Sequence, residues 1–458
     1  MLRIRTGNPQ LDSILHGGFP ACSINVIAGC PGTGKTILAE QLVFANLTED
    51  RPVVYMTTLS EPLEKFVTYL QELSFVDSGR LGGALVYEPI DPLLLDAPEK
   101  LDEVLLGVLQ RHRPRVLVID SFKALGDLMP SLRVWRQTLS RVAGVLGAYE
   151  VTSFLVGEYI SDALTRLPEF AVADGILELT REQTGTRDDR FLRVAKLRGS
   201  GFLDGYHAFR LGRDGLEVFP RLTTPAFPPD YRPRAERASL GVPGLDAMIQ
   251  GGILRGTSTL VLGPAGAGKS LLGMHFLREG VQRGEPALLV ALQENPQQVA
   301  RTLRGFGWRP EELLVPGKVD LFYTSPVELQ IDTIVTEMYR RIERGSVRRV
   351  VIDAANDLER SARDPLRFRD YMYALYQRFA AEDVTALLLM ETPMAQETWH
   401  HVRDPNISYM SDNVVLLGMD LQADLRRTIR VVKSRGTAHD GRERPLAITA
   451  QGLVIGQE

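Results

Sequence analysis

Two eight-residue segments of this chain share the pattern G-x-x-x-x-G-K-S/T. They are Gly29-Cys30-Pro31-Gly32-Thr33-Gly34-Lys35-Thr36 and Gly263-Pro264-Ala265-Gly266-Ala267-Gly268-Lys269-Ser270. From position 35 to position 269 the two lysines are 234 residues apart, about half of the 458-residue chain. Each segment lies between two apolar runs, at 24–28 and 37–45 in the first copy and at 259–262 and 271–277 in the second. This order of strand, glycine-rich turn and helix predicts two phosphate-binding loops on a duplicated domain.

Each residue type in the pattern has a physical role in holding a nucleotide. The glycines let the backbone curl so that successive N–H groups point at phosphate oxygens, and the following helix presents its positive end to the anion. The lysines are expected to reach the β- and γ-phosphates, and the hydroxyls of Thr36 and Ser270 to ligate Mg²⁺. The nucleotide-binding residues predicted in this way are Gly29, Pro31, Gly32, Thr33, Gly34, Lys35 and Thr36, and Gly263, Ala265, Gly266, Ala267, Gly268, Lys269 and Ser270.

The composition is that of an ordinary globular protein, with 44% hydrophobic and 24% charged residues. The net charge of −4 gives no reason to expect nucleic acid or an anionic membrane as a partner. Cys22 and Cys30 are too few for a zinc ribbon and suit no disulfide framework. The N-terminus lacks the apolar core of a signal peptide, and no apolar stretch approaches about 18 residues. We therefore expect a cytoplasmic protein with no membrane segment.

Other segments repeat at nearly the same spacing as the loops, with offsets between 233 and 237. The matching pairs are 7–18 with 241–252, 57–62 with 290–295, 115–120 with 349–353, and 196–199 with 433–436. A fixed long period indicates duplication, so each half is expected to be a complete copy of one domain.

A proline-rich stretch separates the two copies. Residues 220–233 contain five prolines, which remove backbone donors and fix φ, so this stretch predicts an extended linker. We predict a first domain at 1–221, a linker at 222–238 and a second domain at 239–458.

Short apolar runs alternate with amphipathic helical stretches within each half, for example at 101–110 and 368–379. This alternation predicts the α/β class, with a mostly parallel sheet covered by helices. Further runs at 152–156, 175–179 and 191–195 are expected to extend the sheet with a hairpin.

Asp120 and Asp353 end short apolar strands, 85 and 84 residues after the loop lysines at positions 35 and 269. A carboxylate at the carboxyl end of such a strand can hold the hydration shell of Mg²⁺. One apolar run that ends in aspartate is a weak signal, but its recurrence behind both loops is strong. We predict that Thr36 and Asp120, and Ser270 and Asp353, form the two metal sites.

Together these residues resemble the KaiC branch of the RecA-like ATPases. The resemblance rests on the LD-x-x-L-x-GG-like entry, the two loops, the strands that end in aspartate and the K-x-R-G motif of each half, and it extends from about Thr6 to Ile455. It implies two tandem RecA-like P-loop NTPase domains and a homohexameric double ring with ATP at the subunit boundaries. It also implies that Lys196 and Arg198, and Lys433 and Arg435, reach the γ-phosphate of a neighbouring chain, where such cations can neutralise developing charge. The alternative is that these residues are solvated cations at strand ends.

The chain departs from this family where the general base is expected. The family usually has two adjacent glutamates after the second strand, and the first is the expected base; here the pairs are Ser60-Glu61 and Gln293-Glu294. Serine and glutamine cannot take the proton. Glu61 and Glu294 are the candidate catalytic bases, but they are imperfect substitutes because they would point to the opposite side of an extended segment. Losing one base costs on the order of 10²–10⁴-fold, so we predict ATP binding at both sites with slow hydrolysis. ATP would then act mainly by stabilising the ring.

Two more departures concern the second half. Ser408 matches the serine that is phosphorylated in KaiC, whereas Tyr409 replaces the threonine, so Ser408 is either a candidate phosphosite or an ordinary polar residue. Only Gly456, Gln457 and Glu458 follow 452–455, so the long C-terminal tail of clock KaiC, and a timekeeping role of that type, are not expected. Regulatory protein partners of unknown identity could still dock on the faces of the ring.

A RecA/RadA-like DNA-dependent ATPase, either a recombinase or a helicase, is the alternative function. Basic runs at 111–115 and 232–237 and a central channel could hold DNA. Such runs are usually solvated, the charge balance is acidic, and a zinc motif for DNA binding is missing. We therefore favour a regulatory ATP-binding ring over a DNA-acting enzyme. A third interpretation is a scaffold whose nucleotides are never hydrolysed. It differs from the regulatory ATP-binding ring only in the rate of hydrolysis.

Overall fold

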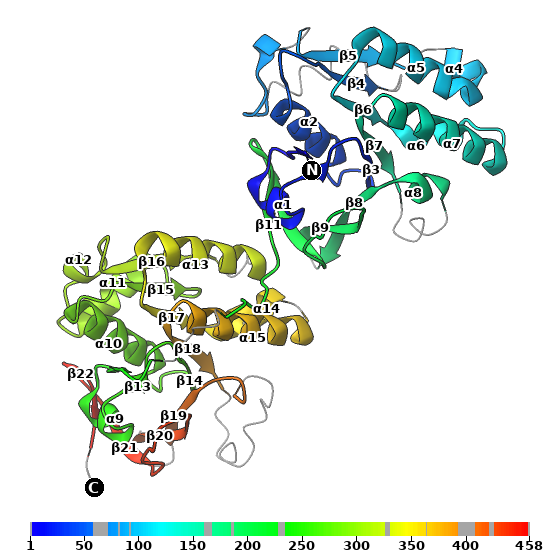
Figure 1. Cartoon of the computed structure of the whole chain (residues 1–458). Helices are drawn as coiled ribbons and strands as arrows, with labels where there is room; N and C mark the ends of the chain where they lie inside the picture. The colour runs from blue at the N-terminus through cyan, green and yellow to red at the C-terminus, as the bar shows by residue number, and fades with distance from the viewer. Residues whose placement is uncertain are drawn as a thin grey trace. The chain divides into compact units, whose positions relative to one another are not determined.

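The computed structural model describes residues 2–57, 72–80, 83–90, 93–159, 167–184, 187–227, 234–325, 330–362, 364–392, 408–420 and 426–456. The chain divides into two compact units, Met1–Arg221 and Leu222–Glu458, and each unit contains a nine-stranded sheet (Figure 1). Helices cover both sides of each sheet, which confirms the α/β class and the tandem RecA-like architecture predicted from the sequence.

The sheet of the first unit is parallel over most of its width. Six parallel strands follow the spatial order β8 (Gly175–Thr184), β3 (Ile24–Gly29), β7 (Thr152–Glu158), β6 (Val116–Asp120), β4 (Val53–Thr57) and β5 (Leu85–Pro89). Beyond β8 the sheet continues antiparallel through β9 (Arg187–Leu197), β10 (His207–Gly212) and β11 (Gly215–Phe219). The described helices are α1 (Pro9–Ile14), α2 (Lys35–Ala45), α4 (Leu93–Asp96), α5 (Leu101–His112), α6 (Phe122–Asp127), α7 (Leu132–Ala148) and α8 (Pro168–Val172), with the 3₁₀ turns η1 (Ser78–Arg80) and η2 (Pro98–Lys100).

The second unit repeats this topology. Its parallel strands follow the order β16 (Val319–Tyr323), β15 (Ala287–Ala291), β17 (Arg349–Asp353), β18 (Thr385–Glu391), β14 (Ser258–Gly263) and β19 (Asn413–Asp420). The antiparallel strands beyond β19 are β20 (Arg426–Ser434), β21 (Arg444–Thr449) and β22 (Gly452–Ile455). The described helices are α9 (Pro243–Met248), α10 (Lys269–Gln282), α11 (Pro296–Gly305), α12 (Pro310–Leu313), α13 (Ile331–Gly345), α14 (Ala355–Ala362) and α15 (Pro365–Ala381).

A two-stranded sheet lies at the start of each unit. In the first unit β1 (Arg3–Ile4) pairs with β2 (Phe19–Pro20), and in the second β12 (Arg237–Ala238) pairs with β13 (Ile253–Leu254). Within the predicted linker, the side chain of Leu222 is buried in the core of the second unit, and its N–H lies 3.5 Å from the hydroxyl of Tyr371. Some predicted linker residues therefore pack against the second unit.

Both faces of each sheet are buried. In β3, Ile27 packs with α2 on one face, whereas the neighbouring Val26 packs with α5 and α7 on the other. Strands covered on both faces read as continuous apolar runs rather than as alternating ones, which is why the strands before the loops were recognisable. Each fully buried aliphatic side chain contributes roughly 1.5–3 kcal/mol to this core.

The strand order places the two predicted elements of each site at one edge of the sheet. Since β3, β7 and β6 are parallel, their carboxyl ends meet at the same edge, where the first loop and Asp120 lie. In the second unit β14, β18 and β17 do the same for the second loop and Asp353. The predicted run at 152–156 does not extend the sheet at its side; it forms β7 in the centre, between the loop strand and the aspartate strand.

Within the described ranges, no helix has the length and apolar character needed to cross a lipid bilayer.

Candidate nucleotide-binding sites

The first loop joins the end of β3 to the start of α2. Gly32 and Gly34 have φ of 73° and 98°, a left-handed conformation that side chains disfavour. A Cβ on Gly29 would come within 2.3 Å of the carbonyl oxygen of Leu179 on the adjacent strand β8. Glycine is therefore required at these positions for the curled backbone that a triphosphate needs.

The second loop has the same geometry between β14 and α10. Gly266 and Gly268 have φ of 78° and 106°, and a Cβ on Gly263 would lie 2.7 Å from the carbonyl oxygen of Leu417. Both glycine frameworks thus fit a phosphate-binding cradle, and both loops lead directly into a long helix whose amino end faces the same edge.

The loop lysines lie inside their own loops. Lys35 Nζ donates to the carbonyl of Cys30 at 2.9 Å, and Lys269 Nζ donates to the carbonyls of Gly263 and Pro264, both at 2.8 Å. Burial lowers the pKa of both lysines, while carboxylates at the same sheet edge oppose this effect. These carboxylates are Glu158 and Asp120 in the first unit and Glu391 and Asp353 in the second.

The predicted metal residues come together in both units. Thr36 Oγ1 donates to Asp120 Oδ2 at 2.8 Å, and Ser270 is hydrogen-bonded to Asp353. Burial outweighs these hydrogen bonds and raises the pKa of both aspartates. A hydroxyl and a carboxylate beside a phosphate cradle are the hard oxygen ligands that Mg²⁺ uses in nucleotide sites, so the residues present fit a bound Mg²⁺.

Gln293 and Glu294 both lie beside the second predicted metal site. Both line one cavity of about 60 Å³ together with Ser270 and Asp353. Strand β15 ends at Ala291 and the chain bends before α11, so the alternation of an extended strand no longer applies. Burial raises the pKa of Asp353 and the charge of Glu294 acts in the same direction, whereas Gln293 Nε2 donates to Asp357 Oδ2 at 2.8 Å. Ser60 and Glu61, the matching pair of the first unit, lie outside the described residues.

The cations of the second K-x-R-G motif lie at the opposite edge of the sheet from their own loop. Lys433 pairs with Val414, which pairs with Leu260 near the start of β14. Lys433 Nζ donates to the carbonyl of Ser408 at 3.0 Å, and Arg435 donates to the carbonyl of Tyr409 at 2.6 Å. Burial lowers the pKa of Lys433. Ser408, the candidate phosphosite, therefore lies with these cations and away from the loop of its own unit.

The first unit repeats this placement. Lys196 pairs with Ile176 of β8, which pairs with Val26 near the start of β3. Lys196 Nζ donates to the carbonyl of Phe170 at 3.3 Å, and Arg198 forms an ion pair with Asp174 at 3.4 Å. Burial lowers the pKa of Lys196. Neither pair of cations is brought to the phosphate loop of its own unit.

Several residues at the sites belong to no recognisable motif and were not predicted from the sequence. Glu158 and Glu391 end β7 and β18 and pair in register with Gly29 and Gly263, the first glycines of the loops. Arg427, at the start of β20, donates from Nε to the carbonyl of Gly266 at 2.9 Å. The only sequence signal for the two glutamates was that each ends an apolar run, and that these two runs are separated by about the spacing of the duplication.

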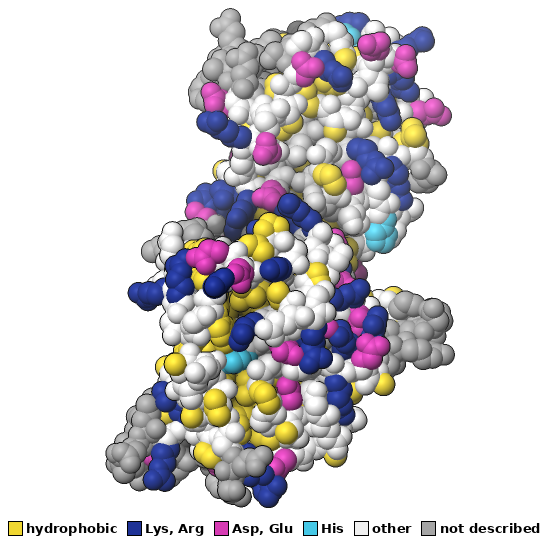
Figure 2. Space-filling model, turned by 90° about the vertical axis from the view of Figure 1, so that its left-hand side faces the viewer, with side chains coloured by type: hydrophobic (Ala, Val, Ile, Leu, Met, Phe, Trp, Pro, Cys, Tyr) yellow, Lys and Arg dark blue, Asp and Glu magenta, His cyan; other side chains and the backbone are white. Residues whose placement is uncertain are grey.

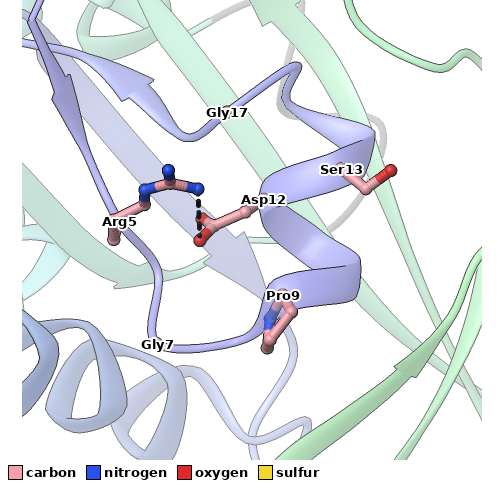
Figure 3. A pocket seen from close by; sticks show the side chains of 6 residues that line it. All are labelled: Arg5, Gly7, Pro9, Asp12, Ser13 and Gly17. Atoms are coloured by element: carbon pink, nitrogen blue, oxygen red, sulfur yellow. Dashed lines mark ion pairs between the residues drawn. The ribbon is translucent and has the colours of Figure 1, made fainter.

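A cavity of about 530 Å³ in the first unit is lined by residues of the N-terminal segment, which are Arg5, Gly7, Pro9, Asp12, Ser13 and Gly17 (Figure 3). Gly7 lies against Gln41 and Ala45 in the last turns of α2, whereas the phosphate loop precedes the first turn. Asp12 accepts hydrogen bonds from the N–H and the hydroxyl of Thr6, at 2.9 and 3.0 Å, and forms the ion pair with Arg5 drawn in Figure 3.

The aspartate of the repeated LD motif makes similar contacts in the second unit. Asp246 accepts from the N–H of Leu240 at 2.8 Å and from the hydroxyl of Ser239 at 2.6 Å. In both units this aspartate therefore holds the entry segment against α1 or α9. This role is structural, and it accounts for the recurrence of the motif without a ligand.

Two phosphate loops, each with a hydroxyl–aspartate pair on a mostly parallel sheet, define the class of tandem P-loop ATPases with RecA-like domains. A family model described as the KaiC ATPase matches residues 4–223 and 238–458, so the chain belongs to the KaiC ATPase family. It is 28% identical to the circadian clock oscillator protein KaiC of Picosynechococcus, over 99% of this chain and 89% of that protein. It is 27% identical to the circadian clock oscillator protein KaiC 1 of Synechocystis, over 99% and 89% respectively.

Proposed function

We propose that this chain binds ATP and Mg²⁺ at both loops and assembles into a homohexameric double ring with nucleotide at the subunit boundaries. In this proposal ATP is hydrolysed slowly, and the ring regulates partner proteins through contacts that depend on the bound nucleotide. The observation that carries the proposal is the position of the K-x-R-G cations, which lie at the sheet edge opposite their own phosphate loop in both units.

The distance involved favours a site completed by a second chain. The backbone N–H of Arg435 donates to the carbonyl of Asp412, and the backbone N–H of Asp412 donates to the carbonyl of Ser258. Ser258 lies five residues before Gly263, the first residue of the loop. At about 3.3 Å per strand residue, this places the backbone of Arg435 roughly 16 Å from the start of its own loop. A cation that neutralises charge at a γ-phosphate must be within hydrogen-bond distance of it. A neighbouring chain that presents its opposite sheet edge would bring these cations to the loop.

Slow hydrolysis rests on the residues at the second site. Gln293 cannot act as a base, and its amide is already donated to Asp357. Glu294 lies on the same cavity as Ser270 and Asp353, so it is the carboxylate best placed to accept a proton from water. Phosphorylation of Ser408 would have to occur between chains, because Ser408 lies at the edge opposite its own loop.

The regulatory role is inferred from the relatives, which are described as circadian clock oscillator proteins. For this chain we propose the more general role of an ATP-dependent ring with protein partners. The DNA-acting alternative receives little support from the basic runs. Arg111 and His112 both contact Glu88, at 2.6 and 3.0 Å, and Arg237 donates to the carbonyls of Ile249 and Gly252. On the face shown in Figure 2, lysine and arginine side chains are interspersed with acidic ones instead of forming a continuous stripe.

Replacing the loop lysines one at a time tests ATP binding at each site. Lys35→Ala and Lys269→Ala each remove a charged donor to the phosphates, so each is expected to weaken ATP binding at its own site roughly 10- to 100-fold. The other site should keep its affinity. Titration with a fluorescent ATP analogue, combined with electron microscopy in Mg-ATP, would report affinity, ring formation and nucleotide occupancy together.

Turnover measured on the same proteins tests the hydrolytic part of the proposal. A typical ATPase rate lowered by the missing base gives roughly 10⁻¹ to 10⁻³ s⁻¹ per site. The double variant, Lys35→Ala with Lys269→Ala, is the control for contaminating ATPases. Fast turnover by wild-type protein would contradict slow hydrolysis, and unchanged binding in the double variant would contradict the assignment of the loops.

A further inference from the structure

A buried polar cluster lies behind the first loop. It consists of Glu40 on α2, Tyr55 on β4 and Tyr87 on β5. Glu40 and Tyr55 are fully buried, and Tyr87 Oη donates to Glu40 Oε2 at 2.9 Å. The two tyrosine rings pack with their centroids 5.4 Å apart. Buried polar groups of this kind need partners; Glu40 Oε2 has one in Tyr87, whereas Glu40 Oε1 has none among the described residues.

The cluster is connected to the predicted metal carboxylate. Tyr55 Oη donates to Asp120 Oδ2 at 3.0 Å, and Thr36 Oγ1 donates to the same oxygen at 2.8 Å. Two donors on one oxygen fix the plane of the carboxylate and leave Oδ1 directed elsewhere. Both donors bind Oδ2, so in the proposed function it is Oδ1 that would bind a water of the Mg²⁺ shell.

The second unit has apolar residues at all three places. By the 234-residue offset and by strand register, Met274 replaces Glu40, Leu289 replaces Tyr55 and Leu321 replaces Tyr87. The cavity of about 60 Å³ beside Asp353 is lined by two of these residues, Met274 and Leu289. The residue at the place of Tyr55 thus has no hydroxyl in the second unit, and it lines this cavity beside Asp353. Asp353 instead has Glu294 and Asp357 as neighbouring charges.

We propose that Tyr55 is a positioning residue for Asp120 and that it makes Mg²⁺ binding at the first site depend on a hydrogen bond that the second site lacks. This inference rests on the proposed function, because it takes Asp120 as the carboxylate that holds the metal's hydration shell. Glu40 and Tyr87 hold Tyr55 in place from behind. Loss of a second-sphere partner of this kind typically lowers metal affinity 10- to 100-fold.

Burial supports this arrangement electrostatically. It raises the pKa of Glu40 to about 8, so most of this carboxyl is neutral at pH 7. A neutral Glu40 adds little negative charge beside Asp120. The cluster therefore gives Asp120 a donor without placing a second anion next to it.

The test is a Mg²⁺ titration of nucleotide binding with one site disabled. In a Lys269→Ala background, the fluorescent and non-hydrolysable analogue mant-AMPPNP reports on the first site when its concentration is kept below the weakened affinity of the second. Tyr55→Phe, which removes one hydroxyl and keeps the ring, is expected to raise the Mg²⁺ concentration at half-saturation roughly 10-fold. Affinity for mant-AMPPNP in EDTA should stay within twofold of the parent, a result that general unfolding would not give.

Tyr371→Phe is the matched control, because Tyr371 also donates from a buried hydroxyl to an aspartate, Asp332, but in the second unit and outside the predicted sites. It should leave the Mg²⁺ midpoint unchanged. Tyr87→Phe, at a half-buried position, should give a smaller shift in the same direction as Tyr55→Phe and serves if Tyr55→Phe does not fold.

Two outcomes separate this inference from the proposed function. An unchanged Mg²⁺ midpoint in folded Tyr55→Phe, or in Tyr87→Phe where Tyr55→Phe does not fold, would overturn the role of Tyr55 while leaving ATP binding intact. Absence of mant-AMPPNP binding to the wild-type chain, with and without Mg²⁺, would overturn the proposed function itself.

Discussion

Mixing chains that carry Lys269→Ala with chains that carry Arg435→Ala is expected to restore ATP hydrolysis that neither variant has alone. Both chains also carry Lys35→Ala, so that only the second site is measured. Loss of a cation that acts in trans costs on the order of 10³-fold or more in turnover. In the mixture, a boundary is competent when an intact loop meets an intact Arg435. Random assembly of a closed ring makes about a quarter of the boundaries competent, and the same fraction of the parental rate should return.

The structural reason for this expectation is the direction of β20. This strand runs antiparallel to β19, so its final residues return to the edge at which β14 begins. Arg435 is held there by the carbonyl of Tyr409 and, at 3.8 Å, by Asp412. A radiometric assay after mixing the chains before assembly in Mg-ATP would measure the recovery.

The control for the mixing experiment contains no intact second loop. Chains with Lys269→Ala are mixed with chains that carry both Lys269→Ala and Arg435→Ala, and no activity should appear. If Arg435 acted on its own loop, the first mixture would show only the sum of the two residual rates, and the proposal of shared sites would be wrong.

Replacing Arg349 by methionine is expected to destabilise the second unit by about 3–5 kcal/mol. Arg349 begins β17 and is fully buried. Its guanidinium is paired with Glu285, donates to the carbonyls of Ser239 and Phe276 at 2.7 and 3.0 Å, and stacks 4.6 Å from the centroid of the Phe276 ring. Removing it leaves the Glu285 carboxylate without its buried partner, although Arg255 remains beside it.

The first unit supplies the matched control for Arg349. Arg115 is its counterpart by the 234-residue offset, but Arg115 is only half-buried. Arg115→Met should change stability by less than about 0.5 kcal/mol. Hydrogen exchange read by mass spectrometry in increasing urea would resolve the two units, with α10 and β17 reporting on the second. A loss below about 1 kcal/mol for Arg349→Met would show that this ion pair is not a main stabilising contact.

The parts of the fold and site that sequence could predict are those with fixed local spacing. The loops need glycine at positions with φ near 73° to 106°, so their pattern is tied to backbone geometry. Asp120 and Asp353 were identified because each ends an apolar strand that is buried on both faces. The duplication of the domain followed from the constant spacing between matching segments. This spacing can be read from the sequence without knowing the order of strands in the sheet.

The parts that sequence could not predict depend on which strands become neighbours. β7 and β18 lie in the centre of their sheets, and only this order places Glu158 and Glu391 beside the loop glycines. Alternation along a strand was extrapolated past Ala291, where β15 ends, so the sequence did not predict that Gln293 and Glu294 line the same cavity. The link from Tyr55 to Asp120 crosses between adjacent strands and leaves no spacing signal at all.

The opposite placement of the phosphate loop and the K-x-R-G cations gives each unit two unlike faces. A contact between unlike faces is heterologous, and it can close into a ring or continue as a helical filament, depending only on the rotation between successive copies. Residues that bind nucleotide therefore cannot by themselves fix the number of subunits. Closure must be specified by side chains that set the angle of the boundary, and substitutions there could turn a ring into a fibre while every nucleotide contact is kept.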